Sequence, residues 1–216
     1  MEDINETLEN LRVRYLTKSL DISDCDKDPL KQFKVWLDET LNIKCAEPNA
    51  FTLSTIHKDQ PRARVVLLKG LNEERFIFYT NYQSAKGVEI QASQKAAMTF
   101  LWLPLQRQVR VEGTITKISA SESDEYFHKR PRGSQIGAIA SPQSQKLKNR
   151  QELEDLFHKA EEEFKDMKLL PRPSHWGGYA LDPQYIEFWQ GRDNRLHDRI
   201  AYEKKGQSWE LSRLAP

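Results

Sequence analysis

The sequence of 216 residues contains little cysteine and no long apolar run. Its two cysteines, Cys25 and Cys45, cannot form a disulfide framework, and no Cys-x-x-Cys pair is present to begin a zinc site. No apolar stretch approaches the roughly 20 residues of a membrane span, and the polar first residues do not resemble a signal peptide. We therefore expect a soluble, cytoplasmic protein of a reducing compartment, with no membrane partner.

Several functional fingerprints are also missing. There is no GxGxxG after a predicted strand, no GxxxxGK[ST], no GxSxG and no HExxH, and the five histidines are never spaced as metal ligands. We expect no bound metal. The 33 Lys and Arg against 32 Asp and Glu give a net charge of +1. This balance argues against charge-driven disorder and against a general nucleic-acid binder, which is usually strongly basic.

What the sequence does contain is a series of short strands between helices. β-Branched or aromatic stretches between turn residues predict strands at 50–56, 62–69, 75–80, 96–103, 107–118, 184–190, 199–203 and 208–214. Apolar spacing and capping residues predict helices at 3–18, from Asp28-Pro29, at 84–93, from a cap at Ser121, and at 150–167. We predict a mainly β fold with flanking helices (α+β), in which a single domain over 1–216 begins with a helical segment at about 1–45.

Two of the predicted strands differ in their patterns. Residues 107–118 alternate apolar and polar side chains, as a strand does when one of its faces lies in a core. The four consecutive aliphatic residues at 65–68 instead predict a strand that is buried on both faces. Arg64 and Lys69 flank this apolar run with opposite parity, so a regular strand directs them to opposite faces. They converge on one ligand only if the strand bends or Lys69 lies past its end; otherwise they extend to solvent.

Cationic side chains gather in three places, although the total charge is balanced. The clusters are Arg62, Arg64 and Lys69; Lys129, Arg130 and Arg132 around Pro131; and Arg192, Arg195 and Arg199 around His197. Arginine binds phosphate oxygens two at a time, and lysine binds them as a point charge. These clusters either bind small phosphorylated ligands or are ordinary solvated cations that nearby acids balance.

Two segments bear on whether these cations bind a phosphorylated ligand. Tyr79-Thr80-Asn81 leads into Ser84-Ala85-Lys86, where a strand-to-helix turn either holds a phosphate on backbone N–H groups or is an ordinary turn and cap. Further along, an aromatic strand and a glycine-containing turn precede Arg195, His197 and Arg199, which share one face if this return is extended. Either Asp193 and Asp198 neutralise these groups or an anion lies among them, and we favour the anion.

Taken in order, these segments resemble the pyridoxamine/pyridoxine 5'-phosphate oxidase family, the FMN enzymes that make pyridoxal 5'-phosphate. Glu187, Trp189, Gln190 and the run Arg195-Leu-His-Asp-Arg199 match the family's C-terminal signature. Shorter pieces follow the family's order at 64–69, 78–81, 107–109, 126–128, 130–132, 134–138 and 213–216. The resemblance runs from about Leu11 onward, and it implies an FMN-binding split β-barrel and a homodimer with FMN at the subunit interface.

The resemblance also implies roles for individual residues. FMN phosphate and ribityl contacts fall to Arg64, Tyr79, Thr80, Lys86, Gln143 and Ser144. The flavin ring falls to Gln108, Trp189 and Arg199, and beside it lies the backbone of Arg64, Val65, Val66, Leu67, Leu68 and Lys69. The substrate phosphate falls to Lys69, Tyr126, Arg130 and Ser134. Arg195 and His197 flank the substrate ring as catalytic residues, and Arg12 and Tyr15 close over it.

The sequence departs from the family pattern at two places. Ala85 stands where an arginine usually precedes the lysine, and Val13 and Arg14 differ from the usual N-terminal lid. The activity implied is oxidation of pyridoxamine and pyridoxine 5'-phosphates to pyridoxal 5'-phosphate by hydride transfer to FMN, with O2 as acceptor giving H2O2. The alternatives are another split-barrel flavin reductase and a non-enzymatic binder of phosphorylated B6 vitamers.

Overall fold

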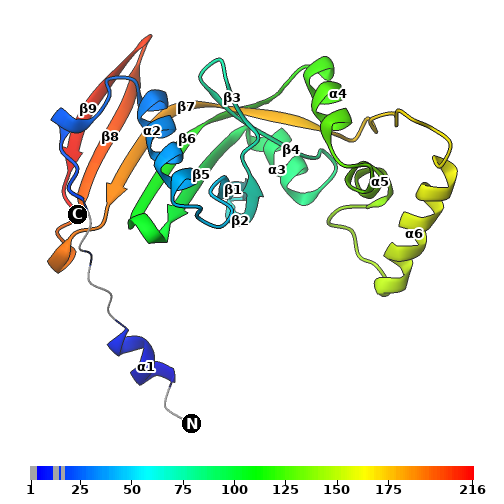
Figure 1. The fold of residues 1–216 in the computed structure, drawn as a ribbon, viewed down its shortest axis with the longest axis horizontal. Helices are drawn as coiled ribbons and strands as arrows, with labels where there is room; N and C mark the ends of the chain where they lie inside the picture. The colour runs from blue at the N-terminus through cyan, green and yellow to red at the C-terminus, as the bar shows by residue number, and fades with distance from the viewer. Residues whose placement is uncertain (1–3, 12–14, 16–17) are drawn as a thin grey trace. The chain divides into compact units, whose positions relative to one another are not determined.

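The computed structural model describes residues 4–11, 15 and 18–216. Its contacts divide the chain into two compact units that take alternate segments of the sequence (Figure 1). The first unit consists of Met1–Pro48, Phe100–Arg110 and Tyr185–Pro216, and the second of Asn49–Thr99 and Val111–Gln184. Three strands contribute residues to both units: β5 (Lys95–Trp102), β6 (Arg107–Lys117) and β7 (Trp176–Gln190). That the chain forms one domain stays a prediction.

The strands follow the order β2-β1-β5-β6-β7-β4-β3, and β8 pairs with both β7 and β9. The remaining strands are β1 (Ala50–His57), β2 (Gln60–Leu67), β3 (Gly70–Asn72), β4 (Arg75–Asn81), β8 (Asp198–Lys205) and β9 (Ser208–Leu214). The pairs β1–β2, β1–β5, β3–β4, β4–β7, β7–β8 and β8–β9 are antiparallel. The predicted fold, mainly β with flanking helices, is confirmed.

The second unit packs aromatic side chains between its strands and covers one end with helices. Phe51, Phe78 and Tyr179 are buried, and Phe78 lies opposite Tyr179 in the register of β4 with β7. Its helices are α3 (Ala85–Ser93), α4 (Ala120–Lys129), α5 (Arg132–Ala140) and α6 (Arg150–Glu163). Phe127 and Trp176 belong to a buried cluster against which side chains of α4, α5 and α6 pack.

The first unit is built around α2 (Pro29–Asn42) and the strands β7, β8 and β9. The carboxylate of Asp28 caps α2 by accepting the N–H of Leu30 at 2.8 Å, and Pro29 fits the first turn. Phe33 and Trp36 on this helix make edge-to-face contacts with Phe100 and Phe188. These contacts fix α2 against the strands that carry the C-terminal signature.

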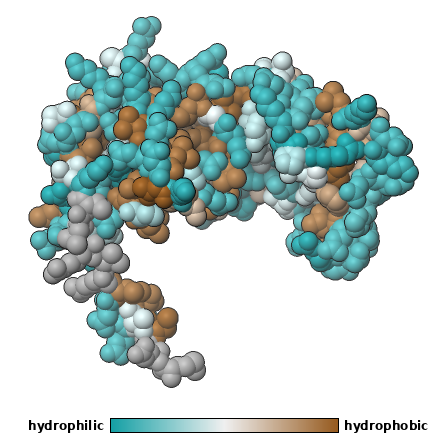
Figure 2. Space-filling view, viewed as in Figure 1, coloured by the Kyte–Doolittle hydropathy of each residue, from teal (hydrophilic) through white to brown (hydrophobic). Residues whose placement is uncertain are grey.

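The predicted helix at 3–18 is wrong in its length. The helix α1 covers only Ile4–Asn10, and Leu11, Tyr15 and Lys18 are not helical; other residues of that range lie outside the described part of the chain. Ile4, Leu8 and Leu11 are 59–67% exposed, and Figure 2 shows apolar side chains at the surface of α1. A helix of this length without a buried face is only marginally stable in water, so the periodicity does not extend it. A short turn, η1 (Ile22–Asp24), follows before α2.

The prediction that residues 65–68 are buried on both faces is also wrong. Val65 is 67% exposed, and Leu68 is buried but follows the end of β2. In the described part of the chain β2 is the first strand in the order and pairs with β1 on one side, so fewer side chains surround its residues than surround those of a central strand.

Three boundaries shift as well. The cap of α4 is Ser119, not Ser121: its hydroxyl accepts the N–H of Glu122, whose carboxylate accepts the N–H of Ser119. The strand β7 begins at Trp176, before the predicted residue 184. The sequence pattern did not predict its first half, because that half contains Gly177, Gly178 and Pro183, which are weak strand formers. The helix α6 ends at Glu163 rather than at 167. Among the helices of the described residues, none has the length and apolar character needed to cross a membrane.

Candidate functional site

A cavity of about 490 Å³ in the second unit collects most of the predicted phosphate-binding side chains. All four residues assigned to the substrate phosphate line it: Lys69, Tyr126, Arg130 and Ser134. Four residues assigned to FMN line the same cavity: Leu67, Tyr79, Thr80 and Gln143. Of the other lining residues, Asn81 belongs to the 79–81 segment, and Lys129 and Pro131 belong to a cationic cluster, both of which the sequence singled out. Sequence reasoning missed only Trp176 among the described residues that line this cavity. The sequence pattern did not indicate a site role for Trp176, because the strand that carries it was predicted to begin eight residues later, at residue 184.

The chain brings Lys69 to the cavity because β2 ends before it. The N–H of Leu68 donates to the Asn49 carbonyl at 2.8 Å, and the N–H of Lys69 donates to the Ile77 carbonyl at 2.8 Å. The backbone therefore leaves β1 and reaches β4 within two residues. This resolves the parity conflict between Lys69 and Arg64: Lys69 lies past the strand end and lines the cavity, whereas Arg64 remains in β2.

Arg130 is the most unusual group in the cavity. It lies between α4 and α5, next to Pro131, and its guanidinium carbon is 4.6 Å from the centre of the Trp176 ring. Its Nη1 is buried without a hydrogen-bond partner in the described part of the chain. Burial lowers the pKa of Arg130, and the nearby Tyr126 opposes this effect. Because a buried unpaired donor is costly, this nitrogen is poised for an anion.

Stacked aromatic rings form the wall beside Arg130. The rings of Tyr79 and Tyr126 stack with centroids 3.8 Å apart, and Tyr79 also stacks on Trp176 at 5.6 Å. Burial, followed by the proximity of Tyr126, raises the pKa of Tyr79 to about 12. Both hydroxyls therefore stay protonated at neutral pH and can donate hydrogen bonds.

A second group of donors adjoins the cavity at the start of α3. The ammonium of Lys86 donates to Gln143 Oε1 at 2.9 Å, and the hydroxyl of Thr80 donates to the same oxygen at 3.3 Å. Ser84 caps α3 by accepting the N–H of Gly87. Burial lowers the pKa of Lys86, as does the positive charge of Arg64, while Glu89 opposes them. Hydroxyl, amide and ammonium donors at a helix start form a favourable anion site.

The residue that holds Arg64 was not predicted. Arg64 donates to Glu89 Oε2 at 2.7 Å and to the hydroxyl of Thr55, and Arg62 donates to Glu89 Oε1 at 3.1 Å. Glu89 is buried; burial raises its pKa, but the hydrogen bonds from Thr55 and the arginines outweigh this and lower it. Helical periodicity places Glu89 in α3 but does not distinguish a buried carboxylate from a solvated one.

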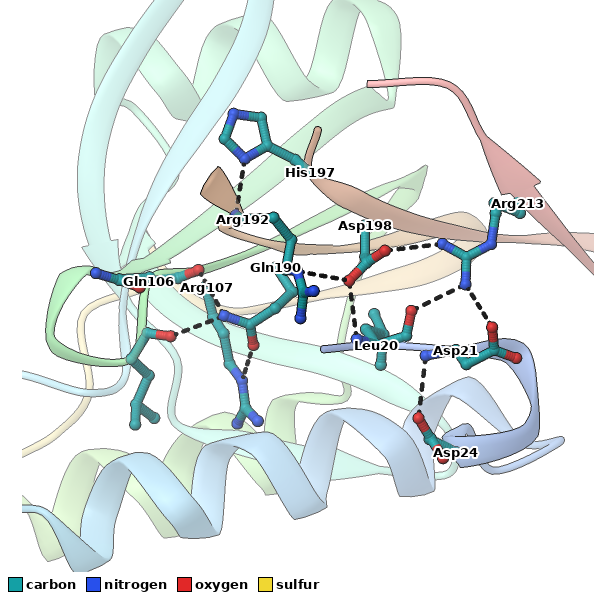
Figure 3. A network of polar contacts seen from close by, with 11 residues as sticks. Leu20, Asp21, Asp24, Gln106, Arg107, Gln190, Arg192, His197, Asp198 and Arg213 are labelled. Carbon is teal, nitrogen blue, oxygen red and sulfur yellow. Dashed lines mark hydrogen bonds and ion pairs between the residues drawn. The ribbon is translucent and has the colours of Figure 1, made fainter. Parts of the chain in front are cut away.

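The predicted residues of the C-terminal signature and Tyr15 belong to the first unit, where the rings of Tyr15, Trp189 and His197 meet. The centroid of the His197 ring lies 4.6 Å from that of Trp189 and 5.4 Å from that of Tyr15. The backbone N–H of Arg192 donates to His197 Nδ1 at 3.0 Å (Figure 3). Burial and the charge of Arg195 lower the pKa of His197, and Asp198 opposes them. The neutral imidazole therefore carries its proton on Nε2.

The condition for a face shared by Arg195, His197 and Arg199, an extended return, is not met in the structure. Residues Asp193–Arg195 form one helical turn, with Asn194 and Arg195 in left-handed conformations (φ 56° and 61°), and β8 begins only at Asp198. These turn conformations interrupt the alternation of side chains along the backbone, so the three residues do not share one face of a strand. Arg195 is exposed.

Arg199 has a partner that neither alternative foresaw. Its guanidinium binds Glu187 through two hydrogen bonds of 2.8 and 3.1 Å, and neither Asp193 nor Asp198 takes that place. Burial raises the pKa of Glu187, but Arg199 and Tyr185 donate to it and Arg110 lies 3.4 Å away, so the pKa is lowered. Gln108 is half-buried in β6, Ser144 has a left-handed backbone (φ 72°), and Arg12 lies outside the described residues.

The sheet with antiparallel strand pairs and flanking helices, together with a cavity lined by hydrogen-bond donors that can bind phosphate, is typical of the class of FMN-binding split-barrel proteins. Residues 37–164 match the family described as pyridoxamine 5'-phosphate oxidase, and residues 176–216 match the pyridoxine 5'-phosphate oxidase C-terminal dimerisation region. The chain belongs to the pyridoxamine 5'-phosphate oxidase family.

Individual relatives agree over the whole length. The pyridoxine/pyridoxamine 5'-phosphate oxidase of Salinibacter ruber is 50% identical over 97% of this chain and 99% of its own. The protein of the same name from Aliarcobacter butzleri is 51% identical over the same shares. Among solved structures, PhzG from Burkholderia lata, in complex with tetrahydrophenazine-1-carboxylic acid, covers 93% of this chain and 99% of its own with a TM-score of 0.86 and 28% identity. An FMN-binding protein from Nostoc punctiforme, 17% identical, covers 88% of this chain and all of its own with a TM-score of 0.73 and shares the fold.

Proposed function

We propose that this protein oxidises pyridoxine 5'-phosphate and pyridoxamine 5'-phosphate to pyridoxal 5'-phosphate, with FMN as the hydride acceptor and O2 as the final oxidant, giving H2O2. Relatives at about 50% identity over the full length carry the name of this activity. The structural observation that supports it most directly is the buried, unpaired Nη1 of Arg130 in a cavity that also contains Lys69 and Tyr126.

In this proposal four side chains hold the substrate phosphate. Arg130 supplies a guanidinium backed by the Trp176 ring, Lys69 supplies a point charge, and Tyr126 and Ser134 supply hydroxyl donors. A hydrogen bond to a charged group contributes about 1.5–3 kcal/mol. The clamp therefore distinguishes a phosphorylated vitamer from its free alcohol, because the alcohol leaves Arg130 Nη1 unpaired.

The donor set adjoining the cavity fits the phosphate and ribityl chain of FMN. The residues that would hold this part are Lys86, Thr80, Tyr79, Gln143 and Ser144, with Arg64 oriented by Glu89. Gln108, Trp189 and Arg199 would contact the flavin, beside the backbone of residues 64–69. When bound, FMN supplies the acceptor for the hydride. Glu89 keeps Arg64 in one orientation through their ion pair. Because Arg62, Arg64 and Lys86 are three cations around this one carboxylate, the cluster retains positive charge that an anion can neutralise.

Two residues of the first unit would act on the substrate ring. Arg195 places a cation beside the reacting carbon. His197 presents Nε2–H, because its Nδ1 already accepts the N–H of Arg192, and so it orients a substrate oxygen or amine rather than taking a proton from it. Tyr15, which packs on His197, would close over the ring together with Arg12.

The protein is proposed to work as a homodimer, with flavin contacts from both subunits. Residues 176–216 match a dimerisation region, which supports this assembly. Cys25 and Cys45 are free thiols, which is consistent with the cytoplasm. We propose neither a nucleic-acid nor a membrane partner.

The test is peroxide formation by the purified protein. A yellow dimer with a flavin spectrum that releases peroxide on addition of pyridoxine 5'-phosphate, and much less with pyridoxine, supports the proposal. A colourless protein that binds phosphorylated vitamers points to a carrier. A yellow protein that is inert to both vitamers, but that reduced nicotinamide nucleotides bleach, points to another flavin reductase.

A further inference from the structure

The segment 213–216, which begins with the last two residues of β9, does not line the phosphate cavity and is not one of the three rings in contact, although its sequence matches the family pattern. Its first residue is tied to three groups (Figure 3). Arg213 Nη1 donates to Asp198 Oδ1 at 2.9 Å, and Nη2 donates to Asp21 Oδ2 at 2.8 Å and to the Leu20 carbonyl at 3.0 Å. One guanidinium therefore connects the start of β8 to the segment before α2.

Asp198 completes this connection from the other side. Its Oδ2 accepts the backbone N–H of Leu20 at 3.0 Å, so Leu20 is held at both its N–H and its carbonyl. Asp198 directly follows His197 in the sequence. The next residue, Arg199, donates from Nη1 to the carbonyl of Ala215 at 2.8 Å. Residues of the segment 213–216 thus contact the two residues that follow His197.

The Leu20 end of the connection is itself well fixed. Leu20 is buried, and Asp21 forms a capping box with Asp24 at η1. Five residues before Leu20, the ring of Tyr15 packs edge-on against His197 and Trp189. The first contact between the segment before α2 and the start of β8 is that of Tyr15 with His197, just before β8. The second is made through Arg213 and Asp198, which hold Leu20.

We propose that Arg213 and Asp198 form a positioning brace, which holds the Leu20–Asp24 segment against the start of β8 and so keeps Tyr15 in contact with His197. A single exposed ion pair contributes little to stability, and Arg213 is 41% exposed. The brace acts through geometry instead, because two hydrogen bonds hold the Leu20 backbone at its N–H and its carbonyl. Three side-chain contacts in turn hold the groups that make them: Arg213 with Asp198, Arg213 with Asp21, and the 3.7 Å ion pair of Arg192 with Asp198. Its role in substrate binding rests on the proposed function.

The experiment compares Arg213→Met with Lys205→Met in the FMN-loaded protein. Lys205 lies on β8 and pairs with Glu203, and both side chains are more than half exposed. The Lys205→Met variant therefore also loses one positive charge but keeps every contact of the brace. For Arg213→Met we expect KM for pyridoxine 5'-phosphate to rise roughly tenfold to hundredfold, with kcat and flavin content little changed. The ¹⁵N NMR signals of the His197 ring are expected to shift. Lys205→Met is expected to match the wild type in all of these.

Three outcomes would overturn the brace. One is a folded Arg213→Met protein with wild-type KM and wild-type His197 signals. Another is an equal rise of KM in Lys205→Met, which would mean that any weakening of the β8–β9 hairpin has the same effect. If Arg213→Met does not fold, Asp21→Asn replaces it, because that change removes the charge that pairs with Arg213 Nη2 and leaves the contacts of Arg213 with Asp198 and with the Leu20 carbonyl in place. Wild-type KM and wild-type His197 signals in that variant would contradict the brace too. A wild-type protein without oxidase activity would refute the proposed function, and the His197 spectra would still test the brace.

Discussion

Arg130 and Trp176 form a cation–π pair in which the guanidinium carbon lies 4.6 Å from the ring centre. The same guanidinium keeps its Nη1 buried and, within the described residues, without a hydrogen-bond partner. The ring face stabilises the cation while leaving its N–H groups free in the plane. A phosphate that enters this cavity therefore meets a donor whose desolvation has already occurred.

The first prediction concerns Arg130→Ala. The variant is expected to raise KM for pyridoxine 5'-phosphate by about tenfold to hundredfold, since a charged hydrogen bond is lost, and hardly to change turnover of unphosphorylated pyridoxine. Peroxide release with both substrates measures the difference. Arg150→Ala is the control, because Arg150 is exposed and pairs only locally with Glu154. An equal loss for both substrates would rule out a phosphate clamp.

The second prediction separates Arg195 from Arg199. Arg195→Leu removes an exposed side chain, so we expect a yellow, folded dimer. Its kcat/KM should fall strongly, because the proposed function places this cation beside the reacting carbon. Arg199→Leu leaves the buried Glu187 with a weaker set of partners, so we expect a lower Tm and loss of FMN, partly reversed by excess FMN.

Flavin absorbance, Tm and peroxide release distinguish the two variants. If the Arg195 variant loses its flavin and the Arg199 variant keeps it, the two roles are reversed. If both retain flavin and full activity, the segment is a structural hairpin and neither role holds.

Much of this fold could be predicted from local pattern. The alternation at 107–118 is seen in the burial of β6, where Val109, Val111 and Ile115 are buried. Val65 shows the limit: an aliphatic run reports hydrophobicity, but whether a strand is central or at an edge depends on neighbours far along the chain. The N-terminal helix shows the same limit, because periodicity does not reveal whether a core is present to bury the apolar face.

For the candidate site, too, contacts between residues near in sequence could be predicted and contacts between distant residues could not. Residues near in sequence, such as Tyr126, Arg130 and Ser134, were expected together and line one cavity. The pair of Arg199 with Glu187 depends on the register of β7 with β8, and the pair of Arg64 with Glu89 joins residues 25 apart in sequence. Neither pairing has a local signal. The left-handed backbone of Arg195 was missed because only a turn conformation, not composition, distinguishes it from an extended return.

The third prediction concerns the pKa of His197, which burial and Arg195 lower below its usual range. A group whose pKa falls on folding contributes stability that is present above its unfolded-state value, about 6.5, and that is lost as pH drops through the folded-state value. We expect the NMR titration midpoint of His197 to lie below that value in the wild type and to rise in Arg195→Leu. The loss of stability in acid attributable to His197 should then shrink. An unchanged midpoint would show that Arg195 does not act on this ring.

The fourth prediction uses two glycines in different surroundings. A Cβ at position 191 would lie 2.6 Å from Tyr15 Cδ1, so Gly191→Ala must displace the Tyr15 ring from its place beside Trp189 and His197. A Cβ at Gly137, inside α5, would meet nothing within 4 Å. Gly137→Ala is therefore the matched control, expected to stabilise the protein by about 0.5–1 kcal/mol and to leave KM unchanged.

For Gly191→Ala we expect a higher KM for pyridoxine 5'-phosphate with flavin content retained, because the proposed function has the displaced Tyr15 ring close over the substrate. Adding Tyr15→Ala to Gly191→Ala should then have less effect than Tyr15→Ala alone, since both changes remove the same contact. Steady-state kinetics of the four proteins measure this coupling. Strictly additive effects would mean that Gly191 and Tyr15 act independently, and that the close approach of the ring to this glycine does not contribute to substrate binding.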